Sequence, residues 1–428
     1  MSLSYEGVMK MGKTITEKIL ARASGRKEVS PGDLIWTKID VLFTHETVGP
    51  RVFNKDFEEL GGKICDTEKF VVFIDHYNLP SSIQQAEIVK YTVDWSRKHG
   101  VKYLYKFCGP EHQILVEEGF VLPGTLILGT DSHTTTAGAL GAFATGIGST
   151  ECAIAITTGM MWLQVPESIK LNWEGHLPRG AMAKDMILYM IGKLGHDGAT
   201  YKACEFTGST IDELSIDGRL VLTNMSVEMG AKNGIINPDD KTLGFVKSVT
   251  DAPFTPIRSD PDAEYEKEHY FDADDLEPLV ACPDNVDNVK AVADVEGTTI
   301  DSALIGTCTG GRLEDMKAAA SILRGRRIHE KVTLLIVPAS WKVYRAMLTQ
   351  GLVEMLLDAG CILTQPTCGP CAGHLGGLLA SGDIRLSAQN RNFKGRSGSQ
   401  DAKIYLASPL TCAASAIKGE ITDPRRFL

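Results

Sequence analysis

Short apolar runs rich in β-branched residues alternate with longer amphipathic stretches along this chain. The apolar runs predict strands over 69–76, 125–134, 331–340 and 361–364. The longer stretches predict helices over 81–100, 138–159 and 341–360. Because strands and helices alternate, we expect an α/β protein in which mostly parallel sheets are covered by helices.

Two changes of pattern divide the chain. Residues 251–289 contain five prolines, and eleven acidic residues lie between Asp260 and Asp287. This composition is typical of a solvated linker or surface excursion and, less often, of an acidic binding patch. A second, less marked change in the pattern of strands and helices lies near Pro166. We therefore expect three α/β domains, over 13–165, 166–285 and 286–428.

Composition and charge narrow the class of protein. The 428 residues are 43% hydrophobic and 23% charged, which is ordinary for a globular protein. The net charge of −10 argues against nucleic acid as a partner. No apolar run reaches the ~20 residues that a membrane helix needs. The N-terminus lacks the apolar core of a signal peptide, so we expect a reducing, cytoplasmic compartment and a poorly ordered extension over 1–12.

The sequence Cys-Gly-Pro-Cys at 368–371 has the pattern of a thioredoxin-like dithiol. Its position near the end of the chain, with Thr367 before it, does not suit that fold. A third cysteine, Cys308, stands in another Gly- and Thr-rich loop, "IGTCTGGRLED". Three thiolates could hold zinc with His374 as a fourth ligand. They could equally hold an iron–sulfur cluster with one iron free of protein ligands, and the spacing leaves both open.

Further polar motifs follow the predicted strands, at the edge where open α/β sheets bind ligands. Carboxylate–histidine pairs suit proton transfer, and arginines suit the binding of carboxylates. The candidates are Asp75 and His76 in "FIDHYNLP", His112 in "GPEHQILVEEG", Asp131 and His133 in "GTDSHTTT", Asn224 and Glu228 in "LTNMSVEMGAK", and Arg391 and Arg396 in "NRNFKGR".

From Lys13 to Arg426 the sequence resembles the aconitase superfamily, and within it the large subunits of 3-isopropylmalate dehydratase and homoaconitase. The resemblance rests on the motifs "DSHTTTAGALGAFATGIGSTE", "NMSVEMGAK", "IGTCTGGRLED", "CGPCAGHLG" and "NRNFKGR" followed by "YLASP". It implies three α/β domains around a central iron–sulfur site. It also implies a [4Fe-4S] cluster whose open iron acts as a Lewis acid, held by Cys308, Cys368 and Cys371.

The resemblance also implies roles for the polar residues. Asp75 and His76 match the pair that protonates the departing hydroxyl group. A second set matches groups that hydrogen-bond the water and hydroxyl at the open iron, namely His112, Asp131, His133 and Glu228, with Ser132 and Asn224 beside them. The substrate and the cluster region are expected to contact Asn390, Arg391, Arg396 and His45.

The family's activity is the reversible removal of water from a hydroxy dicarboxylate. Aconitases carry a fourth, swivelling domain whose serine abstracts the substrate proton. Because this chain ends at "ITDPRRFL", we expect a separate small subunit to supply that base and the loop that selects the substrate.

Isopropylmalate is the favoured substrate, in leucine biosynthesis; homoaconitate, citramalate and 2,3-dimethylmalate are the alternatives. "HETVGP" differs from the family's usual "HEVTSP", the Cys308 loop lacks the Asn and Ser of aconitase, and Thr136 replaces an Asn. An RNA-binding, iron-sensing role is a further alternative, disfavoured by the acidic charge.

Overall fold

The computed structural model describes residues 12–428, so our expectation for the first twelve residues lies almost wholly outside it. The first sheet has five parallel strands. Their spatial order is β4 (Tyr103–Lys106), β3 (Phe70–Ile74), β2 (Val41–His45), β5 (Leu126–Gly129) and β6 (Phe143–Gly146). A separate antiparallel ribbon joins β1 (Leu34–Lys38) to β7 (Met160–Gln164).

Helices cover both faces of this first sheet, which explains its continuous apolar runs. In β2, Leu42 belongs to a core with the helices on one face and Phe43 to a core with those on the other. The first face carries α1 (Ile15–Ser24), α2 (Pro50–Glu59), α3 (Ile83–Lys98) and α5 (Ser149–Thr158). The second face carries α4 (Glu111–Glu117) and the 3-10 helix η1 (Ser132–Leu140).

The second sheet is also parallel, in the order β10 (Asn233–Ile236), β9 (Ala203–Thr207), β8 (Ser168–Glu174) and β11 (Lys267–Asp272). The helical segments of this part of the chain are α6 (Ala183–Leu194), α7 (Ser209–Glu213), α8 (Ile216–Met225), η2 (Ser226–Met229) and α9 (Asp240–Val249).

The third sheet has seven strands. Their order is β13 (Val289–Ala291), β12 (Leu279–Ala281), β18 (Lys403–Ala407), β17 (Ile384–Ser387), β14 (Ser302–Gly306), β15 (Thr333–Val337) and β16 (Ile362–Leu363). The pairs of β12 with β13 and with β18 are antiparallel, and the other pairs in this sheet are parallel. The helices here are α10 (Val292–Val295), α11 (Thr307–Gly310), α12 (Leu313–Leu323), α13 (Trp341–Thr349), α14 (Leu352–Ala359), α15 (Pro409–Lys418) and η3 (Pro424–Arg426).

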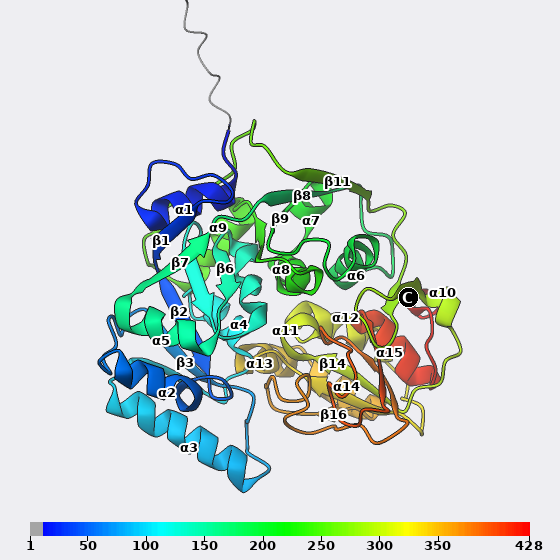
Figure 1. Cartoon of the computed structure of the whole chain (residues 1–428). Coiled ribbons are helices and arrows are strands. Elements are labelled where there is room, and N and C mark those ends of the chain that lie inside the picture. Colours follow the sequence, from blue (N-terminus) through cyan, green and yellow to red (C-terminus); the bar gives the residue numbers. More distant parts are fainter. Residues whose placement is uncertain (1–11) are drawn as a thin grey trace, which may run out of the picture.

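Figure 1 shows how the three sheets are arranged. The first sheet and its helices (blue to cyan) occupy the left, the second (green) lies above and to the right, and the third (yellow to red) lies below it. The short elements α4, α8 and α11, one from each part of the chain, lie near the middle of the view. This arrangement is the α/β architecture that the sequence predicts. The domain limits at 165 and 285 remain our proposal.

Most predicted elements are present, and three predictions need correction. The segment 138–159 is not one helix: Gly141, with φ of 78°, ends η1, and β6 follows before α5 begins. Likewise 341–360 forms two helices, because Gly351 adopts a left-handed φ of 70° between them. Within the acidic stretch, β11 pairs with β8 as an edge strand, so this stretch is not linker throughout.

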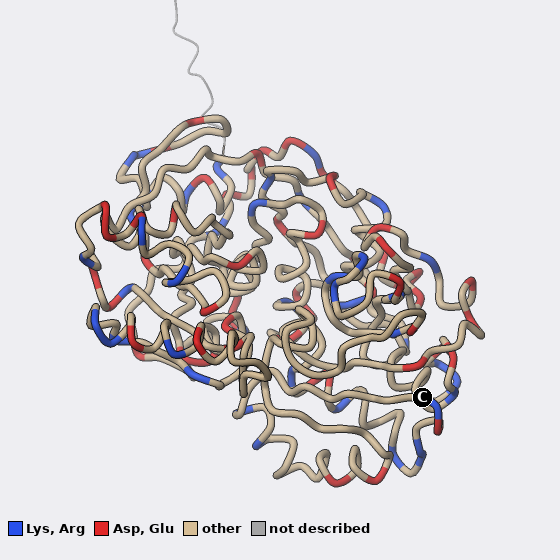
Figure 2. The backbone as a smooth tube through the Cα atoms, turned by 60° about the horizontal axis from the view of Figure 1, so that its bottom comes forward, with Lys and Arg blue, Asp and Glu red and all other residues tan. Residues whose placement is uncertain are grey.

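Charged residues of both signs alternate along the chain over the whole molecule (Figure 2). Among residues 12–428, no helix is both long enough and apolar enough to span a membrane.

Candidate active site

Most of the predicted site residues lie at or just after the carboxyl ends of strands in the first and third sheets, whereas His112 lies on α4, Asn224 on α8 and Glu228 in η2. His45 ends β2, Asp75 and His76 follow β3, and Asp131 follows β5. In the third sheet, Cys308 lies in α11 directly after β14. The loops after β16 and β17 carry the remaining cysteines and Asn390, Arg391 and Arg396. These strand ends form the ligand-binding edge of parallel sheets.

Asp75 and His76 form a buried hydrogen-bonded pair. His76 Nδ1 and Asp75 Oδ1 lie 2.7 Å apart, and the backbone N–H of Glu111 donates to Asp75 Oδ2 at 2.7 Å. Burial would raise the pKa of Asp75, but the attraction and hydrogen bond of His76 lower it overall. Burial would lower the pKa of His76, but the neighbouring Cys368 and Asp75 raise it well above its ordinary value. The pair therefore holds a proton at neutral pH.

His45 stacks on this pair. Its ring lies 4.2 Å from the His76 ring, centroid to centroid, with the planes 16° apart. Burial and the neighbouring His76 lower the pKa of His45 to about 3, so His45 is neutral at physiological pH. Its Nδ1 lies 2.9 Å from Thr47 Oγ1, and this contact orients the ring.

Glu46 is a site residue that the sequence analysis missed. Its carboxylate accepts hydrogen bonds from the backbone N–H groups of His76 at 3.0 Å and Tyr77 at 2.6 Å. Burial and the nearby Asp75 raise the pKa of Glu46 to about 7. Its place beside His45 at the end of a buried strand was the available signal, because the other site motifs share that position.

A chain of hydrogen bonds links five predicted residues across the first, second and third sheets. His112 Nε2 lies 2.9 Å from Asp131 Oδ1, which also accepts from the backbone N–H of His133 at 2.7 Å. His133 Nε2 lies 2.7 Å from Glu228 Oε1. Arg391 Nε then donates to both oxygens of Glu228, at 2.8 and 3.1 Å.

The charged groups linked by these hydrogen bonds stabilise one another. Burial opposes ionisation of Asp131 and Glu228, yet His112 and His133 lower the pKa of Asp131 well below its usual range. His133 and Arg391 lower the pKa of Glu228 in the same way. Both groups are therefore carboxylates at neutral pH. Ser132 Oγ lies 3.5 Å from His133 Nδ1, next to this row of hydrogen-bonded groups.

The three predicted cysteines are free thiols, and two of them are fully buried. Thr307 has a φ of 63°, which is strained for a β-branched residue and turns the chain into Cys308. At Gly311 a Cβ atom would lie 2.5 Å from Thr307 O, so only glycine fits there. The loop of Cys368 docks on the acid–base pair, because its N–H donates to Asp75 O at 2.9 Å.

Amide and guanidinium groups surround the sulfur atoms. Asn224 Nδ2 lies 3.4 Å from Cys308 Sγ and also donates to Thr136 Oγ1 at 2.8 Å. Asn390 lies between two thiols, since its Oδ1 accepts from Cys371 Sγ at 3.3 Å and its Nδ2 lies 3.8 Å from Cys308 Sγ. Donors to sulfur of this kind tune iron–sulfur clusters.

Arg396 adds a cation to this shell, with Nη2 at 3.7 Å from Cys371 Sγ. Its buried Nε has no hydrogen-bond partner in the described chain. Burial and the neighbouring thiols raise the pKa of Cys308, and burial raises that of Cys368 to about 11. Thiols in such a place are stable as thiolates only when they bind a cationic group.

The arrangement fits a cluster better than a single zinc ion. Ligands of one tetrahedral ion lie roughly 4 Å apart. Among residues 12–428, the groups of three or more His, Cys and acidic residues whose ligand atoms all lie within 4.8 Å of one another contain no cysteine. The ring of His374, the proposed fourth zinc ligand, instead lies against His76 and Tyr77, at 5.8 and 5.3 Å between centroids.

A buried lysine supports the loop of Asn390 and Arg391. Lys184 Nζ donates to the carbonyl oxygens of Ala388 at 3.0 Å and Gln389 at 2.6 Å, directly before these residues. Burial lowers the pKa of Lys184 to about 8. This residue was not predicted, since nothing in its local sequence distinguishes it from a surface lysine.

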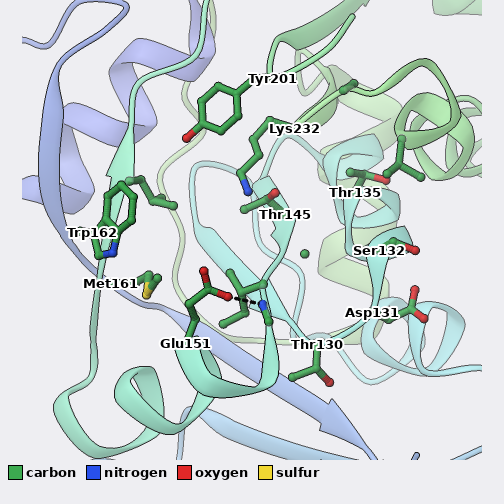
Figure 3. A pocket seen from close by; sticks show the side chains of 16 residues that line it. Thr130, Asp131, Ser132, Thr135, Thr145, Glu151, Met161, Trp162, Tyr201 and Lys232 are labelled. Atoms are coloured by element: carbon green, nitrogen blue, oxygen red, sulfur yellow. Dashed lines mark hydrogen bonds between the residues drawn. The ribbon is translucent and has the colours of Figure 1, made fainter. Parts of the chain in front are cut away.

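A cavity of about 560 Å³ adjoins the site (Figure 3). Asp131 and Ser132 lie on one wall, and Trp162 and Tyr201 lie on the side away from them. Lys232 extends into the space between these walls.

The sequence model of the aconitase family (aconitate hydratase) matches residues 17–298 and 285–419. The chain belongs to this family. The family implies an iron–sulfur cluster, and the free cysteines with their shell of nitrogen donors fit such a group.

Relatives of known name match over nearly their whole length. A protein of Methanopyrus kandleri named "3-isopropylmalate dehydratase large subunit 1" is 47% identical over 98% of this chain and 100% of its own. A "Probable 3-isopropylmalate dehydratase large subunit" of Methanothermobacter thermautotrophicus is also 47% identical, over 97% of this chain and 99% of its own.

A "Probable methanogen homoaconitase large subunit" of the same Methanothermobacter organism is 45% identical, over 96% of this chain and 97% of its own. Among solved structures, the holo-form of Thermococcus kodakaraensis aconitase X matches with a TM-score of 0.49 and 12% identity. That match covers 91% of this chain and 94% of the other.

Proposed function

We propose that this chain is the large subunit of a hydro-lyase that removes water from a hydroxy dicarboxylate and adds it back, with isopropylmalate as the favoured substrate. The observation that carries the proposal is the convergence of an acid–base pair, a chain of charged groups and three free cysteines at one place. The near-complete match to large subunits of 3-isopropylmalate dehydratase supports the substrate.

Cys308, Cys368 and Cys371 are the residues that would hold a [4Fe-4S] cluster. When bound, such a cluster supplies a Lewis acid through an iron that has no protein ligand. Asn224, Asn390 and Arg396 already direct nitrogen donors at the sulfur atoms.

His76 is the proposed acid. Its Nδ1 is engaged by Asp75, so its Nε2 is the atom that offers a proton to the departing hydroxyl group. Cys368 and Asp75 raise the pKa of His76 against the effect of burial, and this keeps that proton available at neutral pH. In the reverse reaction His76 Nε2 takes a proton back from the attacking water.

Arg391 is the proposed anchor for a substrate carboxylate. Glu228 holds Arg391 through Nε alone, so the two Nη groups remain for a bidentate contact. Arg396 completes the positive charge of this wall. His112, Asp131 and His133 hold the hydroxyl group in place through their fixed hydrogen bonds.

A second polypeptide is proposed to complete the site. The relatives are named large subunits, which implies a small subunit. We propose that this partner carries the swivelling domain, with the serine base and the loop that selects the substrate, and that the pair acts in the cytoplasm.

The experiment that tests the function is turnover by the anaerobically reconstituted chain, mixed with its small subunit. The unsaturated intermediate is followed by absorbance with isopropylmalate, homocitrate, citramalate and 2,3-dimethylmalate. We expect turnover of isopropylmalate and none without the partner. Exclusive turnover of another acid would refute the substrate, and no turnover by a fully loaded pair would refute the activity.

A further inference from the structure

Glu111 is a buried residue whose carboxyl group forms no hydrogen bond with any other group in the described chain. It is the first residue of α4 and only 1% exposed. Within residues 12–428, neither Oε1 nor Oε2 has a hydrogen-bond partner. The three other acidic residues nearby, Glu46, Asp75 and Asp131, each accept at least two hydrogen bonds.

This carboxyl group lies between the two proton-handling sets. The backbone N–H of Glu111 donates to Asp75, and its Oε1 lies 3.9 Å from His112 Nε2. One ligand atom each from His45, Glu111 and Asp131 lie within 4.8 Å of one another. Glu111 therefore lies beside three residues of the proposed active site, His45, His112 and Asp131.

A charged Glu111 would be costly here. A buried carboxylate without donors loses its hydration and gains nothing in return. The titratable groups around it are His112 on α4, Asp75 and His76 after β3, Asp131 after β5, His45 on β2, and Cys368. Burial and repulsion from Asp75 and Asp131 raise the pKa of Glu111 well above its ordinary value. A neutral carboxyl group carries a proton that can be donated in a hydrogen bond.

We propose that Glu111 is a further substrate-binding residue, whose neutral carboxyl group donates a hydrogen bond to an oxygen atom of the bound hydroxy acid. The proposal rests on the proposed function and deepens it, because it adds a requirement on the substrate. A substrate with an apolar group at this place would leave a buried donor unpaired, which sites of this kind reject strongly.

The main competing possibility is that Glu111 acts as a carboxylate. His45, Glu111 and Asp131 could together bind a divalent cation, since their ligand atoms lie close enough. The carboxyl group of Glu111 is protonated in the first possibility and ionised in the second, and Glu111→Gln separates the two. Glutamine keeps a neutral donor of the same shape but cannot serve as an anionic ligand.

The first test needs neither substrate nor cluster. The isolated chain is studied by infrared difference spectroscopy of wild type against Glu111→Gln. We expect a protonated-carboxyl band at neutral pH that the substitution removes. Glu118→Gln is the matched control, because Glu118 caps the same helix, is solvent-accessible and pairs with Lys342 Nζ at 2.9 Å. No such band for Glu111 overturns the proposal.

The second test uses the reconstituted pair with isopropylmalate. Glu111→Leu should raise KM by about 10- to 100-fold, as expected for one lost hydrogen bond to a charged oxygen. Glu111→Gln should raise KM several-fold less, and should remove the rise in KM at alkaline pH that ionisation of Glu111 causes in wild type.

Equal losses in the two variants would overturn the proposal. Mn²⁺ or Zn²⁺ retained by the wild-type chain and lost from Glu111→Gln would also overturn it, in favour of a cation site. If the wild-type pair turns over none of the hydroxy acids, the proposed function fails. The infrared band then still decides whether Glu111 is the neutral donor.

Discussion

Replacing Arg391 by lysine tests how the site holds a substrate carboxylate. The Nε atom of Arg391 donates to Glu228 Oε1 and Oε2 at 2.8 and 3.1 Å, which fixes the plane of the guanidinium group. Two Nη groups are thereby presented in a fork that matches a carboxylate. Lysine places its charge on one nitrogen, so it can pair with Glu228 or with the substrate, but not with both in this geometry.

The expected loss follows from the number of hydrogen bonds. A hydrogen bond to a charged group contributes about 1.5–3 kcal/mol. Arg391→Lys removes one of the two proposed bonds to the substrate, and each 1.4 kcal/mol is about tenfold in affinity. We therefore expect KM to rise by roughly 10- to 100-fold. Iron and sulfide content should stay at the wild-type level, because within residues 12–428 the hydrogen bonds of the Arg391 side chain go to Glu228 and not to a cysteine.

The assay is steady-state turnover of isopropylmalate by the anaerobically reconstituted pair, with iron and sulfide measured on the same sample. Arg345→Lys is the control, because Arg345 is an exposed arginine on α13. An unchanged KM in Arg391→Lys with a full complement of iron would refute the anchoring role. A loss of iron would instead show that Arg391 supports the cluster loops.

Four further substitutions test the site and the packing that positions it. Cys371→Ser should abolish retention of iron and sulfide while the melting temperature of the metal-free chain changes little, since serine has almost the same size; chemical analysis and circular dichroism check both, and retained iron would contradict the ligand assignment. Lys184→Met removes the lysine donor from the buried carbonyl group of Gln389, whereas Ala388 O keeps the hydroxyl group of Thr309 as a donor at 2.8 Å. The free energy of unfolding should therefore fall by about 1–3 kcal/mol in denaturant titrations. Burial lowers the pKa of Lys184 to about 8, so between about pH 8 and roughly 10.4 the folded state binds fewer protons than the unfolded state. The free energy of unfolding of the wild type therefore contains a contribution that rises with pH in this range. The Lys184→Met variant should lack this contribution. Gly138→Ala should destabilise the folded protein by about 3 kcal/mol, because the new Cβ would lie 1.7 Å from Gly234 O, where η1 packs on β10. Gly244→Ala, on α9 with no atom near the new Cβ, should instead stabilise the folded protein by about 0.5–1 kcal/mol. Similar melting temperatures for the two variants would contradict this reasoning.

Local pattern was sufficient where neighbours in sequence decide the structure. The apolar run before Asp75 and His76 predicted β3, and the stretch over 81–100 predicted α3, which begins where Ser82 Oγ accepts from the N–H of Gln85. The pattern failed at Gly141 and Gly351, where a left-handed backbone breaks a helix that composition alone would continue.

The sequence by itself determined the α/β class and, through its family motifs, most of the residues gathered in the site. Only the tertiary structure decided which donor meets which acceptor. Arg391 and Glu228 are 163 residues apart, and their contact exists because the loop after β17 packs against η2 from another part of the chain. The same packing surrounds Glu46 with three backbone donors and leaves Glu111 with none. Two glutamates that look alike in sequence therefore acquire different chemistry, because burial and hydrogen bonding depend on neighbours that are distant along the chain.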